Sequence, residues 1–345
     1  MQFSTSSSPF IAPQNSVQRI MLWVLVALVP GSITMIWQFG YGVLFNIIIC
    51  VSTAIMAEAL MLACRGRPII PTLMDFSALV TGLLLALALP TIAPWWIPFI
   101  GAIIAIIITK HLYGGLGYNP FNPAMIAFAV LIVSFPKSMT VWVLPVALIP
   151  DGLSLSNVIS LIFSPISDNT PLQSLLDGIT AATPLDQMKT QLNLNLTVQE
   201  VQANHVFGSL AGEGWQWVAI AYFIGGITLL AKRIISWQIP LGVLLGLFAC
   251  SMFTYLLEPS SAPSPLFHLL SGGAMLGAFF IATDPVTAST TVKGRFIFGL
   301  LIGLLTYIIR TWGGYPEGIA FAVILMNMAV PLIDQYTQPR VYGQK

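Results

Sequence analysis

Runs of apolar residues, each about as long as a bilayer core is thick, recur along almost the whole chain. A helix that crosses a bilayer needs roughly 20 predominantly apolar residues. Ten stretches approach that length, with soft boundaries: 19–37, 41–64, 72–90, 94–111, 122–137, 215–233, 237–257, 269–283, 295–312 and 316–333. The weakest, 269–283, is short and is followed at once by Asp284-Pro285. The pattern predicts an all-α integral membrane protein of about ten transmembrane helices, because helices satisfy their own backbone hydrogen bonds in lipid.

The composition excludes an ordinary soluble fold. Hydrophobic residues make up 57% of the 345 residues and charged residues only 7%, whereas about a quarter of the residues in soluble domains are charged. A net charge of +1 gives no indication of a nucleic-acid partner. Cys50, Cys64 and Cys250 lie inside apolar runs and form no CxxC. We therefore expect buried apolar cysteines and no metal site.

The positions of Lys and Arg predict the orientation, because cytoplasmic loops of membrane proteins are enriched in both residues. With a cytoplasmic N-terminus, ten of the thirteen lie at inward ends: Arg19, Arg65, Arg67, Lys110, Lys232, Arg233, Lys293, Arg295, Arg340 and Lys345. The outward ends hold Lys137, Lys189 and Arg310. We therefore expect a multi-pass membrane protein with both termini cytoplasmic. Residues 1–18 lack the features of a signal peptide and, like 336–345, are expected to form a cytoplasmic tail.

One connection is much longer than the others. Residues 138–214 hold six of the twelve Asp and Glu residues, and they separate a first five-helix half, 19–137, from a second, 215–335. Connections of this length are usually functional or disordered. We therefore expect this outward loop to carry the chemistry, and within it we expect Asn193–Val198 to form a short strand.

Similar tracts recur near the ends of the two halves. The pentapeptide IAFAV occupies 126–130 and again 319–323, and Pro123 and Pro316 keep the same spacing. The helices that contain these tracts are fifth and tenth in the count, so they cross the membrane in opposite directions. We predict an inverted repeat of five plus five helices, in which a pathway would lie near the repeat interface. The alternative is a chance match between two apolar helices.

Within the long loop, the sequence Asp177-Gly-Ile-Thr180-Ala-Ala182-Thr183-Pro184 places a threonine directly before a proline. Pro184 disfavours the helical conformation at Thr183, and the alanines before it leave its hydroxyl unobstructed. We expect an exposed threonine on an extended segment, available for covalent modification. Most loop threonines have no such role, so an ordinary loop is the alternative from these residues alone.

Two longer strings are more specific. They are SGGAMLGAFFIATDPVTASTT at 271–291 and NMAVPLIDQYTQPR at 327–340. On these strings the chain resembles, over almost its whole length, the RnfD (RsxD) membrane subunit of Rnf electron-transport complexes. It resembles more distantly the NqrB subunit of sodium-pumping NADH:quinone oxidoreductase.

The resemblance implies a flavin cofactor. The family carries FMN attached through its phosphate to a threonine, in a motif of the form Asp-x-x-Ser/Thr-Gly/Ser/Ala-Ala-Thr. Asp177, Thr180, Ala182 and Thr183 match that motif, so Thr183 is the implied acceptor for a flavin transferase. A covalent tether would retain a flavin that faces the outer compartment. The family also implies a second, non-covalent flavin (riboflavin) within the helices, which no residue of the sequence locates.

Carboxylates inside the predicted spans are further candidates, because a charge in hydrocarbon is costly unless it is paired or hydrated. Glu58 lies in the second span, Asp75 opens the third and Asp284 interrupts the eighth. A role in an ion pathway is one hypothesis for all three. Pairing with a nearby donor is the alternative for Glu58, and helix capping is the alternative for Asp75 and Asp284.

Together with the resemblance, these features indicate one subunit of an ion-translocating oxidoreductase of the bacterial inner membrane, with no self-contained activity. The resemblance implies that the loop 138–214 is periplasmic and bears the flavin. The complex would relay electrons between ferredoxin-type carriers and NAD and couple them to Na⁺ or H⁺ movement. No GxGxxG follows a predicted strand, so we expect NADH to bind another subunit, among the membrane and peripheral partners of an Rnf-type complex. The alternative is a transporter or channel without redox function, because an inverted repeat suits solute transport equally well.

Overall fold

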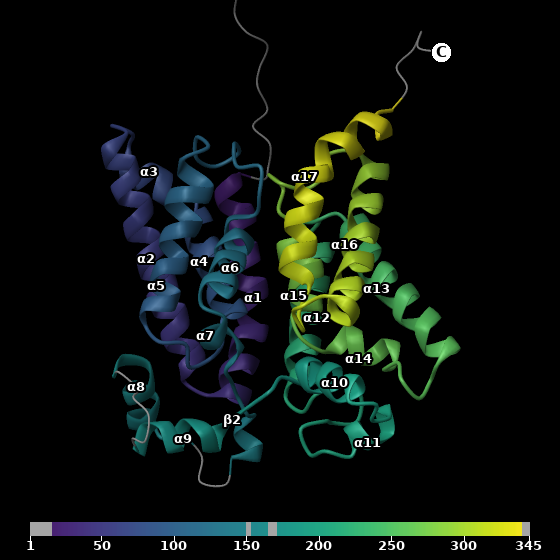
Figure 1. Cartoon of the computed structure of the whole chain (residues 1–345). Helices are drawn as coiled ribbons and strands as arrows, with labels where there is room; N and C mark the ends of the chain where they lie inside the picture. The colour runs from purple at the N-terminus through teal and green to yellow at the C-terminus, as the bar shows by residue number, and fades with distance from the viewer. Residues whose placement is uncertain (1–15, 150–152, 165–170, 340–345) are drawn as a thin grey trace, which may run out of the picture.

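The computed structural model describes residues 16–149, 153–164 and 171–339 and shows two helical bundles side by side (Figure 1). A smaller helical layer lies across one end of both bundles, at the bottom of the view. Residues 1–15 and 340–345 of the two predicted tails, with Asp151 and Asp168 of the long loop, lie outside the described residues.

The first bundle comprises α1 (Val17–Phe39), α2 (Gly42–Cys64), α3 (Ile69–Leu73), α4 (Ser77–Ala88), α5 (Trp96–Ile103) with its π-helical continuation η1 (Ile104–His111), and α6 (Pro123–Ser134). The layer comprises α7 (Pro136–Thr140), β1 (Trp142–Val143), η2 (Val146–Leu148), α8 (Leu155–Phe163), α9 (Pro171–Ile179), β2 (Thr180–Ala181), α10 (Pro184–Asn193) and α11 (Val198–Gln202). The second bundle comprises α12 (Trp215–Ala231), α13 (Gln238–Leu257), α14 (Pro265–Leu270), α15 (Ala274–Leu276) with its π-helical continuation η3 (Gly277–Ile281), α16 (Val292–Trp312) and α17 (Ile319–Thr337).

Membrane-crossing character is confirmed for the chain as a whole. Within the described residues, five helices are long and apolar enough to span a bilayer, namely α1, α2, α13, α16 and α17, and shorter apolar helices accompany them. Every predicted span contains helix, but 269–283 is broken between α14 and α15, where Gly272 adopts a φ of 63°. The count of ten spans and the inverted repeat stay predictions.

The outer surface of the bundles is apolar, as a lipid-facing surface must be. Ile33, Val133 and Met328, on three different helices, are 61%, 62% and 64% exposed. A soluble monomer rarely exposes apolar side chains this extensively. The described part of the chain is therefore an all-α membrane protein with its charged groups gathered at a few points.

Small residues bring the helices of each bundle close together. A Cβ at Gly246 of α13 would collide with the carbonyl of Leu300 in α16, and one at Gly303 of α16 would collide with the carbonyl of Val243. Close backbone approach of this kind is how membrane helices gain packing energy when lipid tails are as apolar as their side chains. α1 and α12 pack along one another in the same way and join the two bundles.

The prediction of a strand at Asn193–Val198 is wrong. Asn193 is the last residue of α10, and Thr197 is the N-cap of α11. The side chain of Thr197 accepts a hydrogen bond from the Glu200 N–H, and Glu200 Oε2 accepts one from the Thr197 N–H at 2.7 Å. This capping box begins a helix. The sequence Thr-x-x-Glu therefore outweighs the apolar alternation of Leu194 and Leu196.

Candidate functional site

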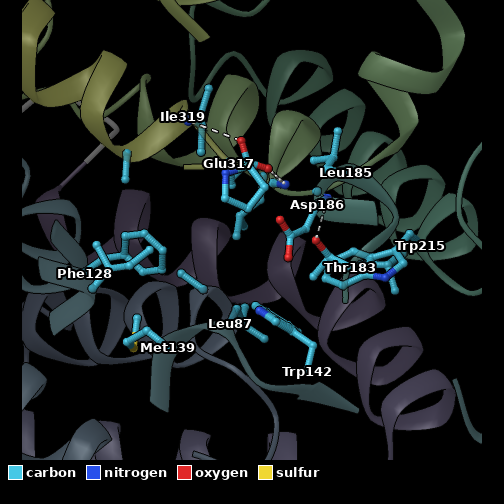
Figure 2. Close-up of a pocket in the computed structure, with 18 of the residues that line it drawn as sticks. Leu87, Phe128, Met139, Trp142, Thr183, Leu185, Asp186, Trp215, Glu317 and Ile319 are labelled. Carbon is cyan, nitrogen blue, oxygen red and sulfur yellow. Dashed lines mark hydrogen bonds between the residues drawn. The ribbon is translucent and has the colours of Figure 1, made fainter. Parts of the chain in front are cut away.

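A cavity of about 110 Å³ lies where the two bundles meet the helical layer (Figure 2). Its walls include several aromatic and sulfur-bearing side chains: Phe128, Trp142, Trp215, Tyr222, Met35 and Met139. They come from α6, the layer, α12 and α1, which are far apart in sequence. Trp142 and Trp215 pack edge to face with ring centroids 5.2 Å apart. The lining therefore offers aromatic and apolar contacts to a flat ring system.

Thr183 lies at this cavity as the N-cap of α10. Its backbone is extended, with φ −60° and ψ 154°, as Pro184 at the first helical position requires. Its Oγ1 accepts a hydrogen bond from the Asp186 N–H at 3.3 Å. This contact does not use the hydroxyl proton, which a modifying group would replace. The predicted extended conformation is confirmed. The side chain is half-buried at the cavity wall and not freely exposed as expected.

The other motif residues lead to Thr183 without entering the cavity. Asp177, near the end of α9, is exposed and accepts a hydrogen bond from Gln173 at 2.8 Å. Thr180 donates to the Leu176 carbonyl at 2.8 Å, and Ala182 is exposed. β2 pairs antiparallel with β1, with Ala181 opposite Trp142. The motif thus sets Thr183 beside the tryptophan that forms one cavity wall.

Two carboxylates approach the same cavity, and sequence reasoning gave a role to neither. Asp186 is half-buried; burial raises the pKa of its carboxyl, and the positive charge of Lys189 opposes that rise. Glu317 accepts hydrogen bonds from the N–H groups of Gly273 at 2.8 Å and Gly318 at 3.0 Å. It therefore caps the beginnings of two helical segments, α15 and α17.

Arg310 neutralises Glu317. Its Nη2 lies 3.0 Å from Glu317 Oε2, and its guanidinium also donates to the carbonyls of His268 at 2.6 Å and Ser271 at 3.2 Å. These contacts hold the break between α14 and α15. From the sequence, Arg310 was counted only as an outward charge, although a charge within an apolar span is a pattern from which a buried role could have been predicted.

Lys189 fastens α10 to the second bundle. Its ammonium donates to the carbonyls of Ile309 at 3.5 Å and Tyr315 at 3.3 Å, and to that of Gly313. These carbonyls lie at and just beyond the end of α16, where a cation is favourable. Burial lowers the pKa of Lys189, and the Asp186 carboxylate opposes this. The contact fixes the helix that begins after Thr183.

The three predicted ion-pathway carboxylates lie at the opposite end of the two bundles, with Glu58 and Asp75 in the first bundle and Asp284 in the second. Glu58 in α2 lies 2.8 Å from Lys110 Nζ and 3.2 Å from His111 Nε2, and both members of the Glu58–Lys110 pair are almost fully buried. Lys110 also donates to Ser77 Oγ at 2.8 Å, and Ser77 in turn donates to Asp75. Lys110 is therefore the buried partner of Glu58. It is not the free inward charge expected from the distribution of Lys and Arg.

Asp75 and Asp284 both bind backbone N–H groups. Asp75 Oδ1 accepts from the Ser77 N–H at 2.7 Å at the start of α4. Asp284 Oδ1 accepts from the Val286 N–H at 3.2 Å and lines a second cavity, of about 120 Å³, together with Ser77 and Lys110. The structure thus brings Glu58, Asp75 and Asp284 to one region, and their part in ion movement stays a prediction.

The described residues contain no cluster of three or more His, Cys, Asp and Glu side chains suited to a metal ion. Cys50 is buried, Cys250 is half-buried and Cys64 is exposed, and all three are free thiols. The expectation that all three would be buried is therefore wrong for Cys64.

Comparison with known proteins assigns the chain to a family. The family model described as NQR2, RnfD, RnfE matches residues 4–343. A Vibrio cholerae protein, named as the D subunit of an ion-translocating oxidoreductase complex, is 51% identical over 347 residues, covering 99% of this chain and 100% of the relative. Proteins of the same name from Vibrio vulnificus and Escherichia fergusonii are 51% and 50% identical over 354 and 350 residues, each with at least 99% of both chains covered. This chain belongs to the NQR2, RnfD, RnfE family.

Proposed function

We propose that this protein is the membrane subunit of an ion-translocating, flavin-dependent electron-transport complex of the Rnf type, and that it carries FMN covalently on Thr183. The names of the relatives support membership in such a complex. The position of Thr183, at the wall of an aromatic cavity between the two bundles, carries the flavin part of the proposal.

The residues around Thr183 fit a flavin attached through a phosphoester. Its Oγ1 sits at the N-terminus of α10, where N–H groups and the helix dipole favour a negatively charged phosphate. Trp142, Trp215 and Phe128 provide apolar surfaces for the ring system. When bound, the isoalloxazine ring supplies the redox chemistry, and the protein supplies position and electrostatics.

Attachment replaces the hydroxyl proton of Thr183 with the phosphoryl group of the flavin. A flavin dinucleotide donor balances this step: its phosphoanhydride bond breaks, a phosphoester forms at Thr183 Oγ1, and a nucleoside monophosphate leaves with the proton. A flavin transferase would catalyse the transfer during maturation. Thr183 is an attachment point and takes no part in turnover.

A second, non-covalent flavin belongs to the same proposal. The cavity lined by Asp284 is also lined by Asn119, Asn122, Phe279 and Phe280, so it offers both amide and aromatic contacts within the helices. The Oδ1 atom of Asn119 is buried without a hydrogen-bond partner, as an acceptor awaiting a ligand donor would be. Partner subunits would handle NAD and the ferredoxin-type carriers, and the complex would move Na⁺ or H⁺.

The test is the fluorescence of the denatured chain on a gel after co-expression with a flavin transferase in the same compartment. We expect flavin fluorescence that survives denaturation and is lost in Thr183→Ala. Thr190→Ala removes an exposed hydroxyl from the same helix and should keep full fluorescence. A wild-type chain without fluorescence under these conditions would contradict the covalent flavin and favour a transporter without redox function.

A further inference from the structure

A third cavity, of about 660 Å³, opens at the end of the second bundle that faces away from Thr183. It lies where α12 ends, α13 begins and α16 begins. The opposite end of α16 contacts Lys189 of α10, so the helix separates this cavity from the candidate flavin site by its full length. The residues that give the cavity its character are Arg233, Trp237, Gln238, Ser289, Thr290 and Arg295.

Two arginines line this cavity from different segments. Arg233 belongs to the connection between α12 and α13, and Arg295 belongs to the first turn of α16. Arg295 Nε donates to the Ser289 carbonyl at 3.2 Å, which orients its guanidinium. Across the part of the chain that the structure describes, no carboxylate forms an ion pair with either arginine. Asp334 reaches this wall, but its oxygens accept hydrogen bonds from Ser289 and Thr290. Neither arginine therefore has a carboxylate within ion-pair distance in the described residues, and the Asp334 carboxylate lies behind Ser289 and Thr290.

One residue of the cavity wall also has an unsatisfied polar atom. Gln238, the first residue of α13, has a buried amide oxygen without a hydrogen-bond partner. A buried acceptor of this kind is costly unless a ligand or water donates to it. A ligand that combines a phosphate with a hydroxyl donor would satisfy both the arginines and Gln238.

The remaining wall is apolar and lies where a membrane surface would be. Trp237 is 57% exposed directly before α13, and Ile234, Ile235 and Ile239 line the cavity beside it. Tryptophan is enriched at the level of lipid headgroups because its ring is apolar and its N–H is polar. This apolar surface offers no favourable contact to a free phosphate ion, but it can pack against the acyl chains of a lipid.

We propose that this cavity binds the headgroup of an anionic phospholipid with a free hydroxyl, such as phosphatidylglycerol. Arg233 and Arg295 bind the phosphate, Gln238 accepts from the headgroup hydroxyl, and Trp237 with the neighbouring isoleucines contacts the acyl chains. Basic pockets between membrane helices on the cytoplasmic side are known to bind such headgroups. The bound lipid would fasten α12, α13 and the start of α16 to the leaflet that the Lys and Arg distribution predicts to be cytoplasmic.

The test compares lipid binding by the purified complex before and after removal of the two charges. The delipidated complex in detergent is titrated with phosphatidylglycerol, and bound lipid is counted by native mass spectrometry while the thermal midpoint is recorded. We expect the Arg233→Gln/Arg295→Gln double variant to bind about thirty-fold more weakly, as expected for the loss of two membrane-surface charges. The Arg67→Gln/Lys137→Gln control removes the same charge elsewhere and should bind as the wild type does.

Two further titrations identify the ligand. Phosphatidylcholine, which lacks net negative charge, should bind weakly to both proteins, and soluble glycerophosphate should neither compete nor raise the midpoint. Equal protection by glycerophosphate would overturn the lipid assignment in favour of a free phosphate compound. Unchanged phosphatidylglycerol binding in the double variant would overturn the site itself. So would loss of a partner subunit from the double variant while lipid binding persists, because the arginines would then bind protein.

Discussion

Within the described residues, each half of the molecule buries one Lys or Arg side chain, and the two are neutralised in different ways. Lys110, at the end of η1, donates only to side chains: both oxygens of Glu58, at 2.9 and 2.8 Å, and Ser77. Arg310, near the end of α16, divides its donors between Glu317 and two backbone carbonyls. The Lys110 contacts join α2, α4 and η1 through side chains. The Arg310 contacts stabilise the break between α14 and α15.

Exposure separates the two pairs further. The side chains of Lys110 and Glu58 are 2% and 3% exposed, whereas Glu317, the partner of Arg310, is 23% exposed. A fully buried charge left without its partner has no access to water, but a partly exposed carboxylate can be hydrated. Losing one partner should therefore cost more free energy in the Lys110–Glu58 pair than in the Arg310–Glu317 pair by the candidate flavin site.

The prediction with the largest expected effect is that the two pairs lie on opposite sides of the membrane. If the Lys and Arg distribution sets the orientation, a reporter fused after Ser174 should be periplasmic, on the side of Arg310. A fusion after Arg67 should be cytoplasmic, on the side of Lys110. The measurement is the activity of paired reporters that function in only one compartment. A cytoplasmic Ser174 fusion would reverse the placement of both pairs and of the flavin.

Removing one member of the Lys110–Glu58 pair should have the largest effect on stability. Glu58→Gln leaves the Lys110 ammonium buried with Ser77 and an uncharged amide, and breaking a buried pair costs about 3–5 kcal/mol. We expect a sharply lower yield of assembled complex, measured by size-exclusion chromatography at equal expression. The double variant Glu58→Gln/Lys110→Met removes both charges and should recover much of that yield.

The same Glu58→Gln variant tests the ion-pathway hypothesis. The ratio of ions moved to electrons transferred, measured in vesicles at equal flavin content, should fall if Glu58 lies on the route. An unchanged ratio in the complex that does assemble would leave Glu58 as a structural partner. Attention would then move to Asp75 and Asp284, which lie in the same region.

The Arg310–Glu317 pair should tolerate change better. Arg310→Gln leaves Glu317 with its hydrogen bonds from the N–H groups of Gly273, Gly318 and Ile319 and with partial access to water. We expect a loss of about 2 kcal/mol in the free energy of unfolding, because a charge-assisted bond is lost and two carbonyls lose a donor. The measurement is the thermal midpoint of the complex. A loss as large as that of Glu58→Gln would refute the difference between the two pairs.

The smallest effect is expected from Lys189, which holds the Thr183 helix to the end of α16. Lys189→Met leaves the carbonyls of Ile309, Gly313 and Tyr315 without that donor, at a cost of about 1 kcal/mol. Flavin attachment should persist, because Thr183 itself is unchanged, while hydrogen exchange in α10 becomes faster. Lys189→Arg keeps the charge and should exchange nearly as the wild type does. Unchanged exchange in the methionine variant would show that α10 is held by its apolar contacts alone.

Local patterns predicted part of the site correctly. Pro184 implied an extended Thr183, and the structure confirms that conformation. Asp75 was expected to be a helix cap or a pathway residue, and its carboxylate does bind the first N–H of α4. Such features depend on neighbours within a few residues, so the chain itself contains the information.

Such local patterns did not predict which charged residues pair across long sequence distances. Lys110 was counted as an inward surface charge, and only the fold shows that it meets Glu58 across 52 positions of sequence. No role was predicted for Glu317, although it caps two helical segments and pairs with Arg310. Neither pairing has a sequence spacing that predicts it, because each depends on how two membrane helices pack.

By itself, the sequence determined that this chain is an all-α membrane protein and where its long apolar helices lie. Apolar length and turn-forming residues act locally, and lipid permits few alternatives to a helix. The tertiary structure alone decided which buried charges neutralise each other and that Thr183 sits at an aromatic cavity. The physical reason is that membrane helices associate through close packing of small residues and a few polar contacts. A one-dimensional pattern of apolar residues does not specify which surfaces those contacts join.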